Sequence, residues 1–173
     1  MSADNFRLPV LGFAAFSGTG KTTLLVKLIR ELTNRKVRIG VIKQSHHDVE
    51  IDIPGKDSYQ LRKAGASQTL LTSPRRWALI HEDGVNMENN LPATIECLDT
   101  GTLDLVLVEG FRHYPFPKIE LNRSELEKPF LFPEDDSIIA IATDMPEPVK
   151  NRLPVLDINN PQEIMDFIYL KFL

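Results

Sequence analysis

A glycine-rich string near the N-terminus constrains this chain more than any other feature. Residues 15–22 read Ala-Phe-Ser-Gly-Thr-Gly-Lys-Thr, and they match the pattern Gly-x-x-x-x-Gly-Lys-Ser/Thr at every fixed position except the first. A nearly continuous apolar run, residues 8–16, leads into the string, and leucine and isoleucine recur at helical spacing after it. A glycine-rich loop between a buried strand and an amphipathic helix predicts a P-loop that binds phosphate.

The residues of this loop have separate expected roles. Gly18 and Gly20 adopt the conformations that turn backbone N–H groups toward one anion. We expect Lys21 to contact the β- and γ-phosphates, Thr22 to ligate Mg²⁺ and Thr23 to reach the α-phosphate. A chance turn before a well-capped helix is the alternative, and the strand before the string disfavours it. The predicted nucleotide-binding residues here are Ser17, Gly18, Thr19, Gly20, Lys21, Thr22 and Thr23.

Strands and helices alternate along the rest of the chain. This alternation predicts one α/β domain over residues 1–173, a three-layer P-loop NTPase fold with a mainly parallel sheet and helices on both faces. The proline-rich and acidic segment 115–136 reads as a variable insertion with at most a short strand. Helices are expected at residues 21–34, 57–66, 91–98 and 161–172, and strands at 8–16, 37–43, 68–72, 77–81, 103–108, 118–121, 138–142 and 155–158.

A P-loop needs a second acid, on a neighbouring strand, to hold Mg²⁺ or its water. Glu109 follows the apolar strand 103–108, and Gly110 after it would let the backbone approach the γ-phosphate. Asp48 lies in the long polar loop 44–56 and is the other acid expected near the metal, alone or with Glu109. A chance acid at a strand end stays open for Glu109. The predicted catalytic residues are Lys21, Glu109 and Asp48, and the predicted metal ligands are Thr22, Glu109 and Asp48.

Two histidines, His46 and His47, precede Asp48 in the same loop. A metal cluster is one interpretation, but adjacent residues of an extended segment point to opposite sides, and no other histidine is near in sequence. A long loop after the second strand is more typical of a nucleotide-sensing switch. Lys43, at the end of that strand, can add charge near the phosphates.

The base is less clearly encoded, because the guanine-reading string Asn-Lys-x-Asp is absent. Residues 139–144 form an apolar strand ending in Thr-Asp, so Asp144 falls where a base-reading loop is expected. A carboxylate there would accept from guanine N1 and N2 and favour GTP over ATP. A turn or a helix cap is the equal alternative for Asp144, and base reading would then lie elsewhere, such as in the loop after Leu156.

Composition excludes several classes of partner. The net charge of −4 gives no general basic field for nucleic acid. The one cysteine, Cys97, excludes an intramolecular disulfide and a multi-cysteine zinc site and fits the cytoplasm. No run approaches the roughly 18 apolar residues of a membrane span, and residues 1–7 lack the order of a signal peptide. We expect neither a nucleic-acid nor a membrane partner.

Five blocks in order, spread over most of the chain, resemble one family. The family is that of the molybdopterin-guanine dinucleotide biosynthesis protein B, MobB, in which Ala15 at the first P-loop position looks normal. The blocks are Phe-Ala-Ala-Phe-Ser-Gly-Thr-Gly-Lys-Thr-Thr at 13–23, Val-Ile-Lys-Gln-Ser-His-His-Asp at 41–48, Pro-Gly-Lys-Asp-Ser at 54–58, Leu-Arg-Lys-Ala-Gly-Ala at 61–66 and Leu-Val-Glu-Gly-Phe at 107–111.

The resemblance implies a SIMIBI-class P-loop fold, a homodimer, and GTP binding with weak GTPase activity. It also implies an adapter role beside a MobA-type guanylyltransferase, which attaches GMP to molybdopterin, with molybdopterin or its guanine dinucleotide form as the cofactor handled. Many SIMIBI ATPases carry a second lysine where Phe16 stands. Without that lysine, and with only Arg62 and Arg112 as candidate arginine donors, slow hydrolysis is expected.

Two other function classes stay open at the level of sequence. One is a small-molecule kinase that uses the same phosphate cradle, with residues 54–66 as the acceptor site. The other is a nickel-type metallochaperone GTPase, against which the sparse histidines and the single cysteine count.

Overall fold

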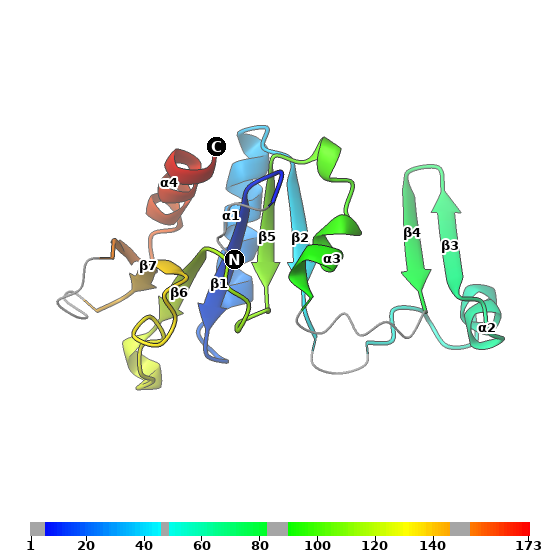
Figure 1. Ribbon diagram of the computed structural model, residues 1–173, viewed down its shortest axis with the longest axis horizontal. Coiled ribbons are helices and arrows are strands. Elements are labelled where there is room, and N and C mark those ends of the chain that lie inside the picture. The colour runs from blue at the N-terminus through cyan, green and yellow to red at the C-terminus, as the bar shows by residue number, and fades with distance from the viewer. Residues whose placement is uncertain (1–5, 46–48, 83–89, 146–152) are drawn as a thin grey trace. The chain divides into compact units, whose positions relative to one another are not determined.

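The computed structural model describes residues 6–45, 49–82, 90–145 and 153–173. Contacts divide the chain into two compact units (Figure 1). Unit 1 comprises Met1–Gln44 and Asn89–Leu173, and unit 2 comprises Ser45–Glu88. The organisation into one domain stays a prediction. Within the part of the chain that the structure describes, no helix has the length and apolar character needed to cross a bilayer.

A six-stranded parallel sheet forms the centre of unit 1, in the order β2-β5-β1-β6-β7-β8. The sheet places the carboxyl ends of β2, β5, β1 and β6 along one edge, where the P-loop also lies. The strands are β1 Val10–Ala15, β2 Ile39–Lys43, β5 Leu105–Glu109, β6 Lys118–Asn122, β7 Ile138–Thr143 and β8 Val155–Asp157.

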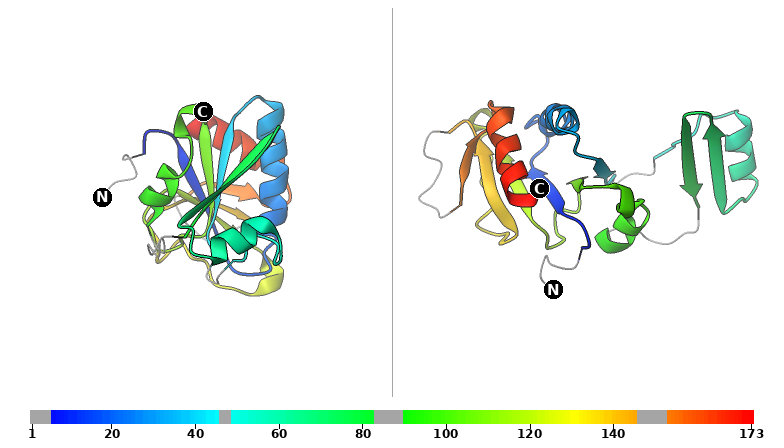
Figure 2. Two further views of the ribbon diagram at one scale, coloured as in Figure 1. Left: turned by 90° about the vertical axis from the view of Figure 1, so that its right-hand side faces the viewer. Right: turned by 90° about the horizontal axis from the view of Figure 1, so that it is seen from above.

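Helices cover both faces of this sheet, as Figure 2 shows in its left view. Helices α1 (Lys21–Asn34) and α4 (Pro161–Phe172) pack on one face, and the short α3 (Leu91–Glu96) packs on the other. Alternate β1 residues explain the two cores, because Leu11 joins the first cluster and Val10 the second. The predicted α/β fold with helices on both faces is confirmed. Short 3₁₀ turns lie at Thr100–Thr102 and Ser124–Leu126.

Strand β6 was underestimated by the sequence interpretation. The short strand is present, but it is a central strand between β1 and β7 rather than part of a variable insertion, and all five of its residues are buried. Its charged residues are buried with partners. Lys118 donates from Nζ to Asp135 Oδ2 at 3.0 Å and to Ser137 Oγ at 2.6 Å. Burial lowers the pKa of Lys118, against the opposing effect of Asp135.

Glu120, at 0% exposure, is the second buried charge of β6. Its carboxylate accepts from the backbone N–H of Leu131 at 2.7 Å and of Phe132 at 2.9 Å. Burial raises the pKa of Glu120, and the two backbone N–H groups act in the opposite direction. The chain after β6 is thereby tied back over the strand, which explains how a segment rich in proline and acids closes one face of the sheet.

Unit 2 contains α2 (Asp57–Lys63) and an antiparallel hairpin of β3 (Gln68–Ser73) and β4 (Arg76–His81). The predicted strand pair is therefore confirmed. Arg62 is buried in ion pairs with Glu50 and Glu82. Among the residues of this unit that the structure describes, Ile80 is the only buried hydrophobic side chain. Unit 2 therefore has little core of its own.

Replacing Glu120 by Gln tests the tie between β6 and the chain that follows it. We expect the free energy of unfolding to fall by about 1–3 kcal/mol, because the amide NH₂ would face one of the two buried N–H groups and leave it unpaired. Urea denaturation measures the change, with the exposed Glu125→Gln as the matched control. Equal stability of the two variants would contradict the role given to Glu120.

Candidate functional site

The P-loop lies between β1 and α1 and has the backbone geometry that an anion requires. Gly18 and Gly20 have φ angles of 86° and 84°, in the left-handed region that glycine adopts without strain. Thr19 is buried, and its hydroxyl donates to the carbonyl of Phe16 at 2.8 Å. Gly20 caps α1 without a side-chain hydrogen bond. The first N–H groups of the helix are thus left for a ligand.

Three charged residues gather beside this loop at the ends of neighbouring strands. Glu109, the last residue of β5, is paired in register with Phe13 of β1 on one side and with Lys43 of β2 on the other. Its Oε1 atom lies 3.9 Å from Lys21 Nζ and 3.5 Å from Lys43 Nζ. The structure therefore brings the predicted residues Lys21 and Glu109 together and adds Lys43 to them.

The backbone after Glu109 is fixed by Gln44. The N–H of Gln44 donates to the carbonyl of Glu109 at 2.8 Å, and the Gln44 side chain accepts from the N–H of Phe111 at 2.6 Å. Gly110 has a φ angle of 115°, and a Cβ added to it would lie 2.5 Å from the Cβ of Gln44. The glycine is thus required by the close approach of Gln44, which holds Glu109 at the site.

The donor set fits Mg²⁺. Glu109 supplies a carboxylate at a strand end, and Thr22 supplies a hydroxyl in the first turn of α1. Among the residues that the structure describes, no three or more His, Cys, Asp or Glu side chains are grouped so that they could hold a metal ion by themselves. Mg²⁺ is commonly held by one or two carboxylates together with phosphates and water rather than by an all-protein cage. Asp48, His46 and His47 lie outside the described residues, so their predicted roles stay predictions.

The two candidate arginine donors have different surroundings. Arg62 is engaged in its ion pairs with Glu50 and Glu82 inside unit 2, where it serves the packing of that unit. The guanidinium of Arg112 lies 5.4 Å from the ring centroid of Phe16. A cation is therefore present beside Phe16 of the P-loop.

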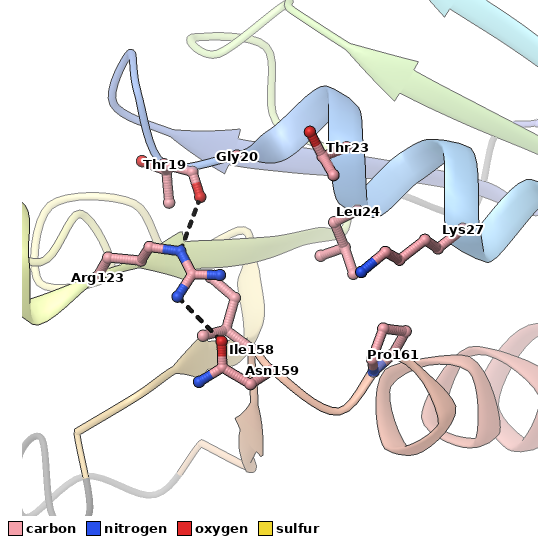
Figure 3. Close-up of a pocket in the computed structure, with 9 residues that line it drawn as sticks. All are labelled: Thr19, Gly20, Thr23, Leu24, Lys27, Arg123, Ile158, Asn159 and Pro161. Atoms are coloured by element: carbon pink, nitrogen blue, oxygen red, sulfur yellow. Dashed lines mark hydrogen bonds between the residues drawn. The ribbon is translucent and has the colours of Figure 1, made fainter.

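A cavity of about 190 Å³ adjoins the P-loop on the opposite side from Glu109 along the sheet edge (Figure 3). Arg123, the residue after β6, joins its walls: Nε donates to the carbonyl of Thr19 at 3.2 Å, and one terminal nitrogen donates to Asn159 Oδ1 at 3.0 Å. The cavity is lined by Thr19, Gly20, Thr23, Leu24, Lys27, Arg123, Ile158, Asn159 and Pro161.

Asp144, the predicted base-reading residue, is not part of this lining. Its Oδ1 accepts from the backbone N–H of Ser124 at 2.8 Å, and its Oδ2 lies 3.9 Å from Arg123. The hydrogen bond from Ser124 is the main cause that holds the pKa of Asp144 below its usual value. Arg123 and Lys27 were missed by the sequence interpretation, whereas Asn159 lies in the loop after Leu156, the alternative region for base reading. Arg123 directly follows β6, and a residue after a strand of the parallel sheet is a candidate for the binding edge. Placing β6 in the sheet would therefore have indicated Arg123.

Comparisons with known proteins agree with this geometry. Residues 10–144 match the family model of MobB, described as molybdopterin guanine dinucleotide synthesis protein B. The chain is 48% identical to a molybdopterin-guanine dinucleotide biosynthesis adapter protein of Escherichia coli, with 96% of this chain and 94% of that protein covered. It is 45% identical to the protein of the same name from Haemophilus influenzae, over 95% of this chain and 89% of that protein.

Solved structures give the same result for the fold. The crystal structure of Bacillus subtilis MobB superposes with a TM-score of 0.72 at 25% identity, over 96% of this chain and 99% of that one. A second structure, of a molybdopterin-guanine biosynthesis protein B, has a TM-score of 0.72 at 23% identity, with 93% and 98% of the two chains covered. The chain belongs to the MobB family.

Proposed function

We propose that this chain is an adapter of molybdopterin-guanine dinucleotide biosynthesis that binds GTP with Mg²⁺ and works beside a MobA-type guanylyltransferase. The observation that carries the nucleotide part is the uncapped N-terminus of α1 next to Lys21, Lys43 and Glu109. The adapter part is supported by two relatives of that name, which this chain matches at 48% and 45% identity over nearly their whole lengths.

The site can bind a triphosphate in a defined way. Backbone N–H groups of the P-loop and of the first turn of α1 would surround the phosphates, and Lys21 would move from Glu109 to their β- and γ-oxygens. Thr22 and Glu109 would then hold the metal ion, which neutralises phosphate charge. Asp48 is kept as a possible further ligand. Lys43 stays beside Glu109 and limits the negative charge that the phosphates meet there.

Slow hydrolysis follows from the same arrangement. Rapid phosphoryl transfer to water needs a group that orients the water and a cation that stabilises the transition state. Arg62 is engaged elsewhere, and Arg112 lies over Phe16 at the P-loop. We propose that nucleotide binding, rather than fast turnover, is the working part of the cycle, and that molybdopterin or its guanine dinucleotide form is handled in the cytoplasm with the transferase.

A homodimer is the second part of the proposal, and unit 2 supports it. Cross-strand neighbours on one face of the hairpin include the exposed pair Leu70 and Leu79 and the exposed Trp77. A two-stranded hairpin is marginal in water on its own, and units near about 40 residues usually need oligomerisation or another staple. A second copy of this chain is the occupant we propose for this face, because pairing two such faces would supply the core that the unit lacks.

The nucleotide assignment is tested by replacing Lys21 with Ala. We expect GTP binding in the presence of Mg²⁺ to weaken by at least about 100-fold, because charged contacts to two phosphates are lost while no core residue changes. Thr22→Ala should reduce only the Mg²⁺-dependent part. Calorimetric titration measures both, with the exposed Lys128→Ala as the control. Affinity of the folded Lys21→Ala variant equal to that of the wild type would refute the P-loop assignment.

The dimer is tested by placing a charge on the apolar face of the hairpin. We expect Leu79→Glu to convert a wild-type dimer into monomers, since two buried carboxylates would face each other across the interface. Sedimentation equilibrium at several concentrations gives the state. Leu170→Glu, at an exposed apolar position of α4, is the control and should remain dimeric. A monomeric wild type would contradict the proposal.

Reconstitution tests the adapter role. With Mg-GTP and molybdopterin alone, we expect this chain to form no guanine dinucleotide and to hydrolyse GTP on the order of 10⁻³ s⁻¹ or slower, as GTPases without an arginine finger do. Adding it to a MobA-type transferase should raise the yield of dinucleotide, and the Lys21→Ala variant should not. Dinucleotide formation by this chain alone, or rapid phosphorylation of a small acceptor, would identify it as an enzyme instead.

A further inference from the structure

The cavity beside the P-loop is lined by Thr23, the residue expected to reach the α-phosphate, so the nucleoside end of a bound nucleotide would point toward it. Thr19 and Gly20 of the P-loop and Thr23 of α1 form one side of it, and Asn159 and Pro161, after β8, form the other. Its volume of about 190 Å³ is below the roughly 300–1,000 Å³ of pockets that hold a whole drug-sized ligand. With the phosphates on the P-loop, the cavity has room for one ring system.

The charged groups that line this cavity are all hydrogen-bond donors. Lys27 and Arg123 are cationic, and no carboxylate is among the lining residues. The amide oxygen of Asn159 already accepts from Arg123. A ring that presents acceptors to Lys27 and Arg123 is therefore favoured, and a ring that presents an amino group to them leaves donors facing donors.

Arg123 is held in one orientation by groups around it. Nε donates to Thr19 in the P-loop, one terminal nitrogen donates to Asn159 after β8, and Asp144 after β7 lies 3.9 Å from that same nitrogen. Figure 3 shows the other terminal nitrogen turned toward the side of the cavity where Leu24 and Lys27 lie. A guanidinium fixed in this way offers a directed donor with little further loss of entropy.

The two purines differ at the atoms that such a donor meets. Guanine presents acceptors at O6 and N7, whereas adenine presents an acceptor at N7 and an amino donor at N6. We propose that Arg123 selects a 6-oxopurine by donating from its second terminal nitrogen to O6, and that Asp144 acts as a positioning residue through Arg123 and Ser124. The proposal rests on the proposed GTP binding, and it replaces a direct contact of Asp144 with the base.

Base analogues separate the two ways of reading guanine. ITP keeps O6 and N7 but lacks the N2 amino group, and 2-aminopurine riboside triphosphate keeps N2 but lacks O6. If Arg123 reads the base, the wild type binds GTP and ITP within about threefold, and binds ATP and the 2-aminopurine nucleotide about tenfold or more weaker, the range of one hydrogen bond from a charged donor. If a carboxylate reads N1 and N2, ITP is the weaker ligand by a similar factor.

Variants assign the effect to a residue. Arg123→Met should bring the GTP/ATP affinity ratio close to one, and Arg123→Lys, which keeps the charge but loses the contacts that fix its direction, should restore part of it. The exposed Arg30→Met on α1 is the control and should keep the wild-type ratio. Asp144→Asn should leave the GTP/ITP ratio unchanged. Ratios of affinities are the readout, because loss of the hydrogen bond from Arg123 to Thr19 weakens the binding of every nucleotide equally and leaves the ratios unchanged.

Two results would overturn the role of Arg123 while leaving GTP binding in place: an unchanged GTP/ATP ratio in the folded Arg123→Met variant, or a preference of about tenfold for GTP over ITP that Asp144→Asn removes. The analogue series uses the wild type alone, so it decides the matter even if Arg123→Met does not fold. Wild-type protein that binds no GTP would overturn both this inference and the proposed function.

Discussion

The carboxylate of Glu109 is the point on which the site depends. Glu109 is the last residue of β5, which lies between β2 and β1 in the sheet. Lys43 ends β2 and the P-loop with Lys21 follows β1, so this parallel order places the acid between the two lysines. In the absence of phosphates those lysines neutralise a partly buried charge, which would otherwise be costly. When phosphates and a metal ion bind, the lysines and Glu109 would exchange their ion pairs for contacts with these ligands. The backbone need not change, because Gln44 and Gly110 already fix the end of β5.

The parts of this arrangement that sequence predicts are those encoded by neighbours in the chain. The P-loop, the bounds of α1 and α4, the hairpin of unit 2 and the place of Glu109 at a strand end all follow from local motifs and periodicity. The central place of β6 does not follow, although a short strand was predicted at residues 118–121, because Lys118 and Glu120 break the apolar pattern of a buried strand. Their burial is compensated by Asp135 and by the N–H groups of Leu131 and Phe132, partners that only the folded chain brings near.

The assignment of this strand to an insertion also explains why the base site was only half predicted. Asp144 was chosen because it ends an apolar run, and the structure does place it near the P-loop edge of the sheet. Arg123 has no such pattern, since it follows a strand that sequence had assigned to an insertion. Arg123 contacts Thr19, which is 104 positions away in the sequence, and Asn159, which is 36 positions away. Such contacts depend on strand order, which local patterns do not contain.

The residues that lead out of unit 1 also contact the end of β5. Lys43 and Gln44 are the last residues of unit 1 before the chain enters unit 2 at Ser45. Both contact the end of β5, Lys43 through the carboxylate of Glu109 and Gln44 through backbone and side-chain hydrogen bonds. The last two residues of unit 1 before Ser45 are therefore held by the same strand end that carries the acid of the site.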